Sequence, residues 1–182
     1  MQDSIHPDTQ QNDMAAEAYL RQLKSTFEQF PNDIELYLFT AKGQDDVFSQ
    51  ANRQVIRAFR ELTDKITLRE YDLDHELAQK WNVTSSPTLL IAPENYSIRW
   101  LGAPMGEEAK TFLETLILVG LGQSSLSEQS LKVIKKINSP RNIKIFVSPT
   151  CPYCPQEAVN AVKAAVEMPE FVSLEIVDIQ SE

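Results

Sequence analysis

The amino-acid sequence predicts an α/β protein built from two similar units in tandem, the second of them incomplete. Short apolar runs typical of strands alternate with helical patterns between Ile34 and Gly122. The order helix, strand, turn, helix, strand then recurs about 110 residues further along, from Ile34 to Ile143. Because the repeat ends after its second strand, we expect the chain to be part of a longer polypeptide. The 182 residues, of which 42% are hydrophobic, are enough to form a substantial core.

The first unit is expected to span residues 14–122, after a flexible tail over residues 1–13. Its first two strands are joined through a helix and should pair in parallel, whereas its last two strands are close enough in sequence to form a hairpin. The expected elements are a helix over 14–30, a strand over 34–40, a helix over 47–62, a strand over 65–74, a short helix over 75–83, a strand within 84–93, a strand over 96–104 and a helix over 106–122.

The second unit is expected to span residues 123–182, and it carries both cysteines of the chain. Its expected elements are a leading helix over 123–139, a strand over 143–148, a helix over about 156–167 and a strand over 171–179. Because this unit stops after two strands, we expect its half-sheet to have an open edge and an uncovered apolar surface.

The two cysteines lie in the sequence Cys151-Pro152-Tyr153-Cys154, where the predicted strand meets the predicted helix. A helix N-terminus offers unpaired N–H groups and a partial positive charge, which stabilise a thiolate. We therefore expect Cys151, nearer the exposed end of the helix, to attack a disulfide. Cys154 would then resolve the mixed disulfide, in a thiol–disulfide exchange. Pro152 and Tyr153 would tune the exposure and the potential of the pair.

The first unit resembles the thioredoxin fold in the segment "YDLD…ELAQKWNVTSSPTLLIA", which matches the second strand, the second helix and the turn before the third strand. This resemblance implies a cis peptide bond between Ser86 and Pro87. In that family the redox motif follows the first strand, but here "IELYLFT" is followed by "AKGQDDV", which has no cysteine. The fold we expect is therefore two tandem thioredoxin-like units, the first of them redox-silent.

The layout and the motif "SPTCPYCP" are similar to those of tandem thioredoxin-fold protein disulfide oxidoreductases and of the N-terminal domain of the alkyl hydroperoxide reductase flavoprotein subunit. In the latter family only the second unit keeps its cysteines, as here. The resemblance implies a module that relays electrons from a flavoprotein reductase to a peroxiredoxin-like or other protein disulfide. We expect no cofactor bound within this chain, and FAD only in a fused reductase part, because "GLGQSS" follows a helix and is a poor dinucleotide fingerprint.

The net charge and the N-terminal sequence of the chain limit which partners it can bind and in which compartment we expect it. A formal net charge of −9 and a pI near 4.8 argue against nucleic acid and an anionic membrane, which both require a basic surface. The opening sequence "MQDSIHPDTQQND" has no apolar targeting segment, so we expect a cytoplasmic protein. In a reducing cytoplasm a Cys-x-x-Cys pair is more often catalytic or metal-binding than a structural disulfide.

Several alternatives remain open at this stage. Zinc needs four ligands, and only His6 and His75 could join the cysteines, so we expect no metal site. Cys-Pro-Tyr-Cys also occurs in dithiol glutaredoxins, which would imply a glutathione-dependent reductase. The non-enzyme alternative is a redox-inert docking scaffold with a thioredoxin fold. Asp178 is interpreted either as a general base beneath the cysteines or as an exposed residue at a strand end, and Glu108 as an acid that the helix dipole favours in a first turn.

Overall fold

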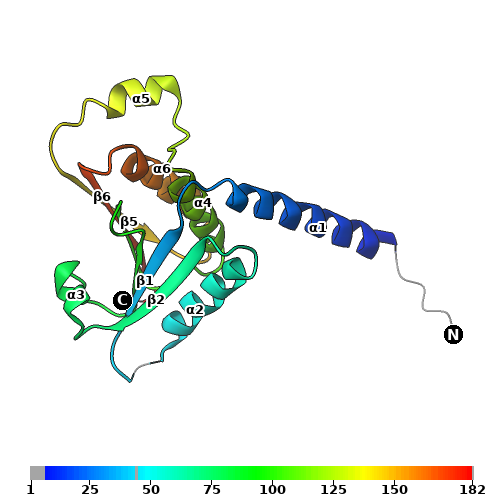
Figure 1. The fold of residues 1–182 in the computed structure, drawn as a ribbon, viewed down its shortest axis with the longest axis horizontal. Helices are drawn as coiled ribbons and strands as arrows, with labels where there is room; N and C mark the ends of the chain where they lie inside the picture. The colour runs from blue at the N-terminus through cyan, green and yellow to red at the C-terminus, as the bar shows by residue number, and fades with distance from the viewer. Residues whose placement is uncertain (1–6, 44, 182) are drawn as a thin grey trace.

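Six strands form one continuous sheet in the order β2-β1-β3-β4-β6-β5 (Figure 1). The computed structural model of the chain describes residues 7–43 and 45–181. All six predicted strands are present, within a few residues of the expected limits. They are β1 (Ile34–Thr40), β2 (Ile66–Asp72), β3 (Thr88–Ile91), β4 (Ser97–Leu101), β5 (Arg141–Val147) and β6 (Val172–Asp178).

The strand pairing joins the two units. β1 and β2 are parallel, and β3 is antiparallel to both β1 and β4, so the predicted connections of the first unit are confirmed. β6 lies between β5 and β4 and is parallel to both. The expectation that the second unit would keep a half-sheet with an open edge is therefore wrong for β6, because β4 of the first unit covers that edge. Only β5 keeps an outer edge in the second unit.

Six helices connect and cover the strands in the described part of the chain. They are α1 (Pro7–Glu28), α2 (Val47–Arg60), α3 (Glu76–Lys80), α4 (Glu108–Leu121), α5 (Glu128–Ile134) and α6 (Cys154–Glu167). α5 is much shorter than the helix predicted over 123–139, and it buries none of its residues. α6 begins two residues before the predicted start, because proline in a first helical turn sacrifices no needed N–H donor.

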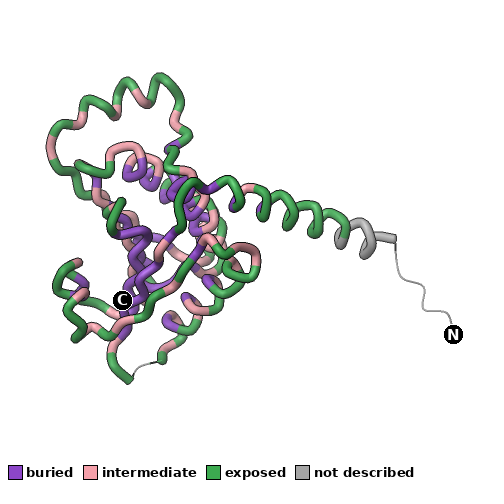
Figure 2. Tube along the Cα trace, in the orientation of Figure 1, coloured by how far each residue is buried: buried purple, intermediate pink, exposed green. Residues whose placement is uncertain are grey.

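Helix α1 begins at Pro7, so the predicted tail is wrong for residues 7–13, while residues 1–6 lie outside the described residues. Proline is favoured at the start of a helix, since its missing N–H would have no partner there. α1 projects away from the sheet, and its turns from Met14 onward are exposed until they approach the body of the protein (Figures 1 and 2). Phe27, near its C-terminal end, is fully buried.

The main core lies on one face of the sheet and is shared by both units. Helices of the first unit contribute Ile56 from α2 and Phe112 from α4, and α6 of the second unit contributes Val162, all of them fully buried. Figure 2 shows buried residues along the central strands and along α4 and α6. A smaller core on the opposite face includes Phe39 of β1 and Ala78 of α3. The shared main core fixes α4 and α6 against the same stretch of sheet.

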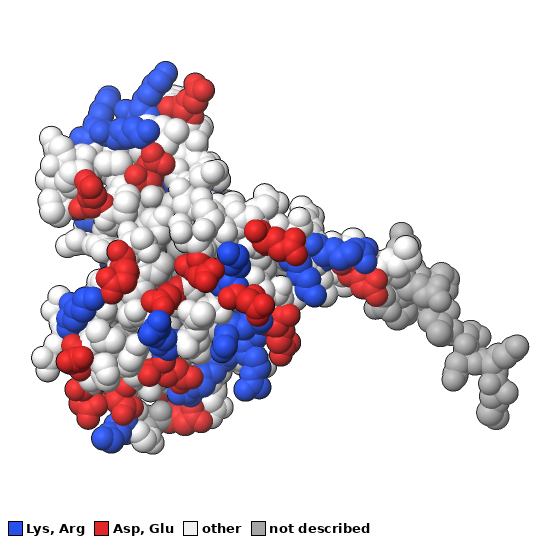
Figure 3. All heavy atoms as spheres, in the orientation of Figure 1, with Lys and Arg blue, Asp and Glu red and all other residues white. Residues whose placement is uncertain are grey.

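The charged surface is mixed. On the face shown in Figure 3, the basic side chains are divided into separate groups with acidic side chains beside them. This face has no continuous basic surface of the kind that binds the phosphate backbone of a nucleic acid. Among the residues that the structure describes, no helix is both long and apolar enough to cross a membrane.

Candidate functional site

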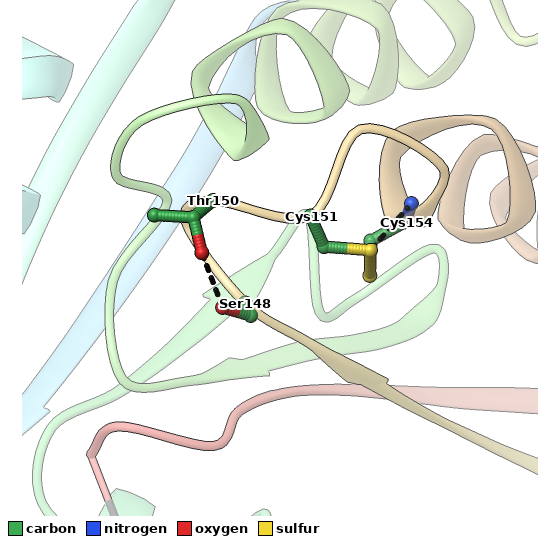
Figure 4. The surroundings of a disulfide bond; sticks show 4 residues. All are labelled: Ser148, Thr150, Cys151 and Cys154. Atoms are coloured by element: carbon green, nitrogen blue, oxygen red, sulfur yellow. Dashed lines mark hydrogen bonds between the residues drawn. A yellow bond between two sulfur atoms is a disulfide. The ribbon is translucent and has the colours of Figure 1, made fainter.

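The cysteine pair lies on the turn between β5 and α6. Val147, the last residue of β5, is buried, and the chain leaves the sheet there. The N–H of Cys151 donates to the carbonyl oxygen of Ser148 (3.0 Å), and the hydroxyls of Ser148 and Thr150 are 3.4 Å apart (Figure 4). α6 then begins at Cys154. The buried strand and the short turn together place Cys151 immediately before the N-terminus of a helix.

Cys151 and Cys154 are joined by a disulfide, with their Cα atoms 5.5 Å apart. The N–H of Cys154, a donor in the first turn of α6, points at the Cys151 sulfur, and the N···Sγ distance is 3.2 Å (Figure 4). Both cysteines are partly buried, whereas Pro152 is exposed and Tyr153 is 81% exposed. A helix N-terminus favours negative charge, so this arrangement favours a thiolate on Cys151 once the disulfide is reduced.

A loop of the first unit contacts the cysteine turn directly. The carbonyl oxygen of Pro149 accepts a hydrogen bond from the N–H of Glu107 (3.0 Å), just before α4 begins. Gly106 has a φ of 58°, and a Cβ atom at this residue would lie 2.4 Å from the same Pro149 oxygen. Glycine is therefore required both by the backbone conformation and by the close approach. This contact brings the start of α4 next to the cysteines.

Two carboxyl groups are buried in the same region. Glu108, the first residue of α4, and Asp178, the last residue of β6, are each only 1% exposed. Asp178 pairs in register with Val147, the residue that begins the cysteine turn. The interpretation of Asp178 as an exposed strand end is therefore wrong. Glu108 lies in a first helical turn as expected, but its burial was missed; the available signal was its position four residues before Phe112, on the apolar side of α4.

The two carboxyls hold their protons more tightly than exposed ones. Burial raises the pKa of Glu108, the Thr111 hydroxyl partly opposes this rise, and the charges of Asp178 and Glu107 add smaller increases. Burial also raises the pKa of Asp178, although the N–H of Gln180, donating to Asp178 Oδ1 (2.9 Å), opposes this shift. Neither side-chain oxygen of Glu108, nor Oδ2 of Asp178, has a hydrogen-bond partner among the described residues. Buried carboxyl groups with raised pKa values are often found at functional sites.

Pro87 lies beside the turn of the first unit that corresponds to the cysteine turn, the turn after β1. The Ser86–Pro87 peptide bond is cis. The hydroxyl oxygen of Ser86 accepts a hydrogen bond from the N–H of Ala41 (2.8 Å), and the carbonyl oxygen of Pro87 accepts one from the N–H of Gly102 (3.0 Å). Ala41 follows β1 directly, in the sequence that has no cysteine. The turn after β1 therefore keeps the position of a redox site without its sulfur atoms.

His75 and the "GLG" sequence, considered above for a metal site and a dinucleotide site, both cap helices in the structure. His75 caps α3, and its Nδ1 accepts the N–H of Leu77 (3.1 Å), while His6 lies outside the described residues. Within the described ranges, no three His, Cys, Asp or Glu side chains are grouped so that they could hold a metal ion. Gly122 caps the C-terminus of α4 with a φ of 63°. The "GLG" sequence therefore ends a helix, whereas a dinucleotide phosphate is bound at a helix N-terminus.

Comparison with known proteins identifies structural relatives. No protein-family model and no curated protein sequence matches the chain. The alkylhydroperoxide reductase AhpF from Enterococcus faecalis is 28% identical with a TM-score of 0.74, and the match covers 90% of this chain and 79% of that one. The separately solved NTD_N/C domain of that reductase is 29% identical with a TM-score of 0.73, covering 90% and 80%.

A protein disulfide oxidoreductase from Aeropyrum pernix has the same fold, with 21% identity, a TM-score of 0.73 and coverage of 91% of this chain and 75% of that one. The expected mixed α/β, tandem thioredoxin-like architecture is confirmed by these similarities and by the six-stranded sheet. Together with the Cys151–Cys154 disulfide, they indicate a thiol–disulfide redox role. The chain is thus similar in fold to an alkylhydroperoxide reductase and to a protein disulfide oxidoreductase, and it carries a disulfide of its own between Cys151 and Cys154.

Proposed function

We propose that the chain is a protein disulfide oxidoreductase module of a peroxide-reducing system. In this proposal the Cys151–Cys154 couple receives electrons from a flavoprotein reductase and passes them to the disulfide of a peroxiredoxin-like protein. The carrying observation is the cysteine pair at the start of α6, with the Cys154 N–H donating to the Cys151 sulfur at 3.2 Å. The similarity to the alkylhydroperoxide reductase AhpF supports the choice of partners. The proposed compartment is the cytoplasm, where reduced thiols persist.

The reaction begins from the reduced chain. The Cys151 thiolate attacks one sulfur of the target disulfide, a bond forms between the two sulfurs, and the other target sulfur leaves as a thiolate. Cys154 then attacks the Cys151 sulfur, which releases the second target thiolate and closes the Cys151–Cys154 disulfide. The two electrons have moved to the target. A reduced flavoprotein returns two electrons and two protons to the module, so the chain itself needs no bound flavin.

The second step requires a proton acceptor for Cys154, and we assign this role to Glu108. Glu108 begins α4 and Cys154 begins α6, and the Glu107–Pro149 hydrogen bond joins the residue before α4 to the turn that leads into α6. The carboxyl is buried, and its oxygens make no hydrogen bond of good geometry among the described residues, although the nearby Thr111 hydroxyl lowers its pKa in part. Burial raises the pKa of Glu108, which makes it a stronger base than an exposed glutamate.

The experiment that tests the proposed function is a trap for the mixed disulfide. Reduced Cys154→Ser protein is mixed with a peroxiredoxin that carries its disulfide, and the products are separated without reductant. Cys151 should form a stable mixed disulfide in this variant, because the resolving thiol is missing. Cys151→Ser protein is the matched control and should form none. The proposal is contradicted if neither variant traps the target, or if only glutathione reduces the wild-type disulfide, which would indicate the glutaredoxin-like alternative.

A further inference from the structure

A pocket of about 500 Å³ lies on the sheet where the two units join, on the face opposite the main core. Its floor is formed by β4 of the first unit and by β6 and β5 of the second, and Asn82, just after α3, forms part of its wall. Ile98, between two floor residues of β4, is buried in the main core on the other face. A volume of this size is in the range of binding sites for small molecules.

The floor of the pocket presents polar side chains in two rows, and each row crosses all three strands. The strand register aligns the members of a row, and side chains that are aligned on neighbouring strands lie on the same face of a sheet. The members are Arg99, Glu175 and Lys144 in the first row and Ser97, Ser173 and Asn142 in the second. The pocket therefore offers charged and hydrogen-bonding groups from both units to one ligand.

The first row contains one cation that no carboxylate neutralises. Lys144 and Glu175 form an ion pair, with Nζ and Oε2 2.8 Å apart. Arg99 forms no ion pair within the described ranges. Its guanidinium donates instead to two carbonyl oxygens at the C-terminal end of α3, those of Trp81 (2.9 Å) and Asn82 (3.2 Å). These bonds hold the partly buried guanidinium in place and use two of its five N–H donors, so three remain for a ligand.

The second row adds uncharged donors. The hydroxyl of Ser173 donates to Asn142 Oδ1 (2.7 Å), and nothing in the described part of the chain accepts a hydrogen bond from the Asn142 Nδ2 group. The hydroxyl of Ser97 also has no hydrogen-bond partner among those residues. The unused groups of the pocket are therefore mainly donors, together with one positive charge. A ligand group that is negatively charged and accepts several hydrogen bonds satisfies both.

We propose that this pocket binds a small molecule through an oxyanion, a phosphate or carboxylate group held by the Arg99 guanidinium. The planar guanidinium matches either group with two parallel hydrogen bonds, which a lysine ammonium cannot do. Asn142 and Ser97 donate to the remaining oxygens of the ligand. The net charge of −9 for the whole chain does not oppose this binding, because the first row of the pocket holds two cations and one anion. The inference is independent of the cysteine chemistry.

The test uses wild-type protein labelled with nitrogen-15, whose amide NMR signals are followed during titration with sodium phosphate or sodium glutarate. The ionic strength is held constant with sodium chloride. The signals of residues 97–99, 142–144 and 173–175 should shift and reach saturation with at least one of the two anions, and the anion with the lower Kd identifies the head group of the ligand. Shifts that do not saturate with either anion, or that spread over the exposed lysines and arginines, would overturn the inference.

Variants then locate the binding group. Arg99→Gln should raise the Kd for the tighter anion about tenfold or more, because charge-assisted hydrogen bonds are lost, and Asn142→Ala should raise it about threefold. Arg60→Gln makes the same change of charge at an exposed residue of α2 and should leave the Kd unchanged. Equal effects of Arg99→Gln and Arg60→Gln would overturn the inference. If Arg99→Gln protein does not fold because the end of α3 is released, Asn142→Ala and the wild-type titration decide.

Discussion

Replacing Ile176 with alanine should destabilise both units together, because Ile176 lies at the seam where they share one sheet. Ile176 is fully buried on β6. It pairs in register with Trp100 of β4 on one side and with Ile145 of β5 on the other. Phe112 of α4 packs edge-on against Trp100, with ring centroids 6.0 Å apart. A cavity at Ile176 therefore weakens the contact between first-unit and second-unit residues.

The expected loss follows from the atoms removed. Ile176→Ala deletes three buried carbon atoms, and each contributes about 0.8 kcal/mol of transfer free energy, or about 2.4 kcal/mol together. The cavity that remains adds to this cost, so the free energy of unfolding should fall by about 3 to 4 kcal/mol. The free energy of unfolding of a typical domain is only about 5 to 15 kcal/mol, so this loss is a large part of it.

Urea denaturation measures this loss. With a denaturant slope of about 2 kcal/mol/M, the midpoint of unfolding should fall by about 1.5 to 2 M. Tryptophan fluorescence reports on the first unit, which holds Trp81 and Trp100, and far-ultraviolet circular dichroism reports on the whole chain. The two signals should shift together. Ile179→Ala is the matched control, since Ile179 lies just beyond β6 and is 55% exposed, and it should cost less than about 1 kcal/mol. Equal losses in the two variants, or a shift in circular dichroism alone, would refute the shared core.

Three further changes test local features of the fold. Asp46→Ala removes the N-cap of α2 and should lower the free energy of unfolding by about 1 kcal/mol. Burial alone would raise the pKa of Asp46, but hydrogen bonds from Ser49 outweigh burial and lower it. The stabilisation by the cap is therefore complete above the unfolded pKa of 3.8 and is lost as the pH falls through the lower pKa of the folded protein. Gly106→Ala should displace the Pro149 turn and slow disulfide reduction, measured by stopped-flow exchange with dithiothreitol. Tyr153→Ala, at an 81% exposed position, should change the free energy of unfolding by less than about 0.5 kcal/mol in the same urea assay.

The elements that the sequence predicts well are specified by local pattern. β1 and β5 are short apolar runs bounded by polar turns, and the start of α6 is marked by a motif that needs a helix N-terminus for its chemistry. The cysteine pair is predicted for the same reason, because Cys151 and Cys154 are three residues apart and their relationship does not depend on distant parts of the chain.

The features that the sequence does not reveal depend on contacts between distant segments. The pairing of β4 with β6 brings Trp100 beside Ile176, and the sequence of neither strand indicates that the two strands pair. Glu108 resembles an ordinary acid at a helix start until α4 is placed beside the cysteine turn. Asp178 is ambiguous in the sequence for the same reason, since the end of a strand is buried or exposed according to what packs over it.

The pH dependence of Cys151 alkylation, in reduced wild-type and Cys154→Ser protein, tests thiol–disulfide exchange at its first step. We expect an apparent pKa for Cys151 clearly below the value of about 8.5 for a free cysteine, because the N-terminus of α6 stabilises the thiolate. The wild-type disulfide should also re-form in mild oxidant. An apparent pKa at or above about 8.5, with no disulfide re-forming, would contradict thiol–disulfide exchange and favour a docking scaffold.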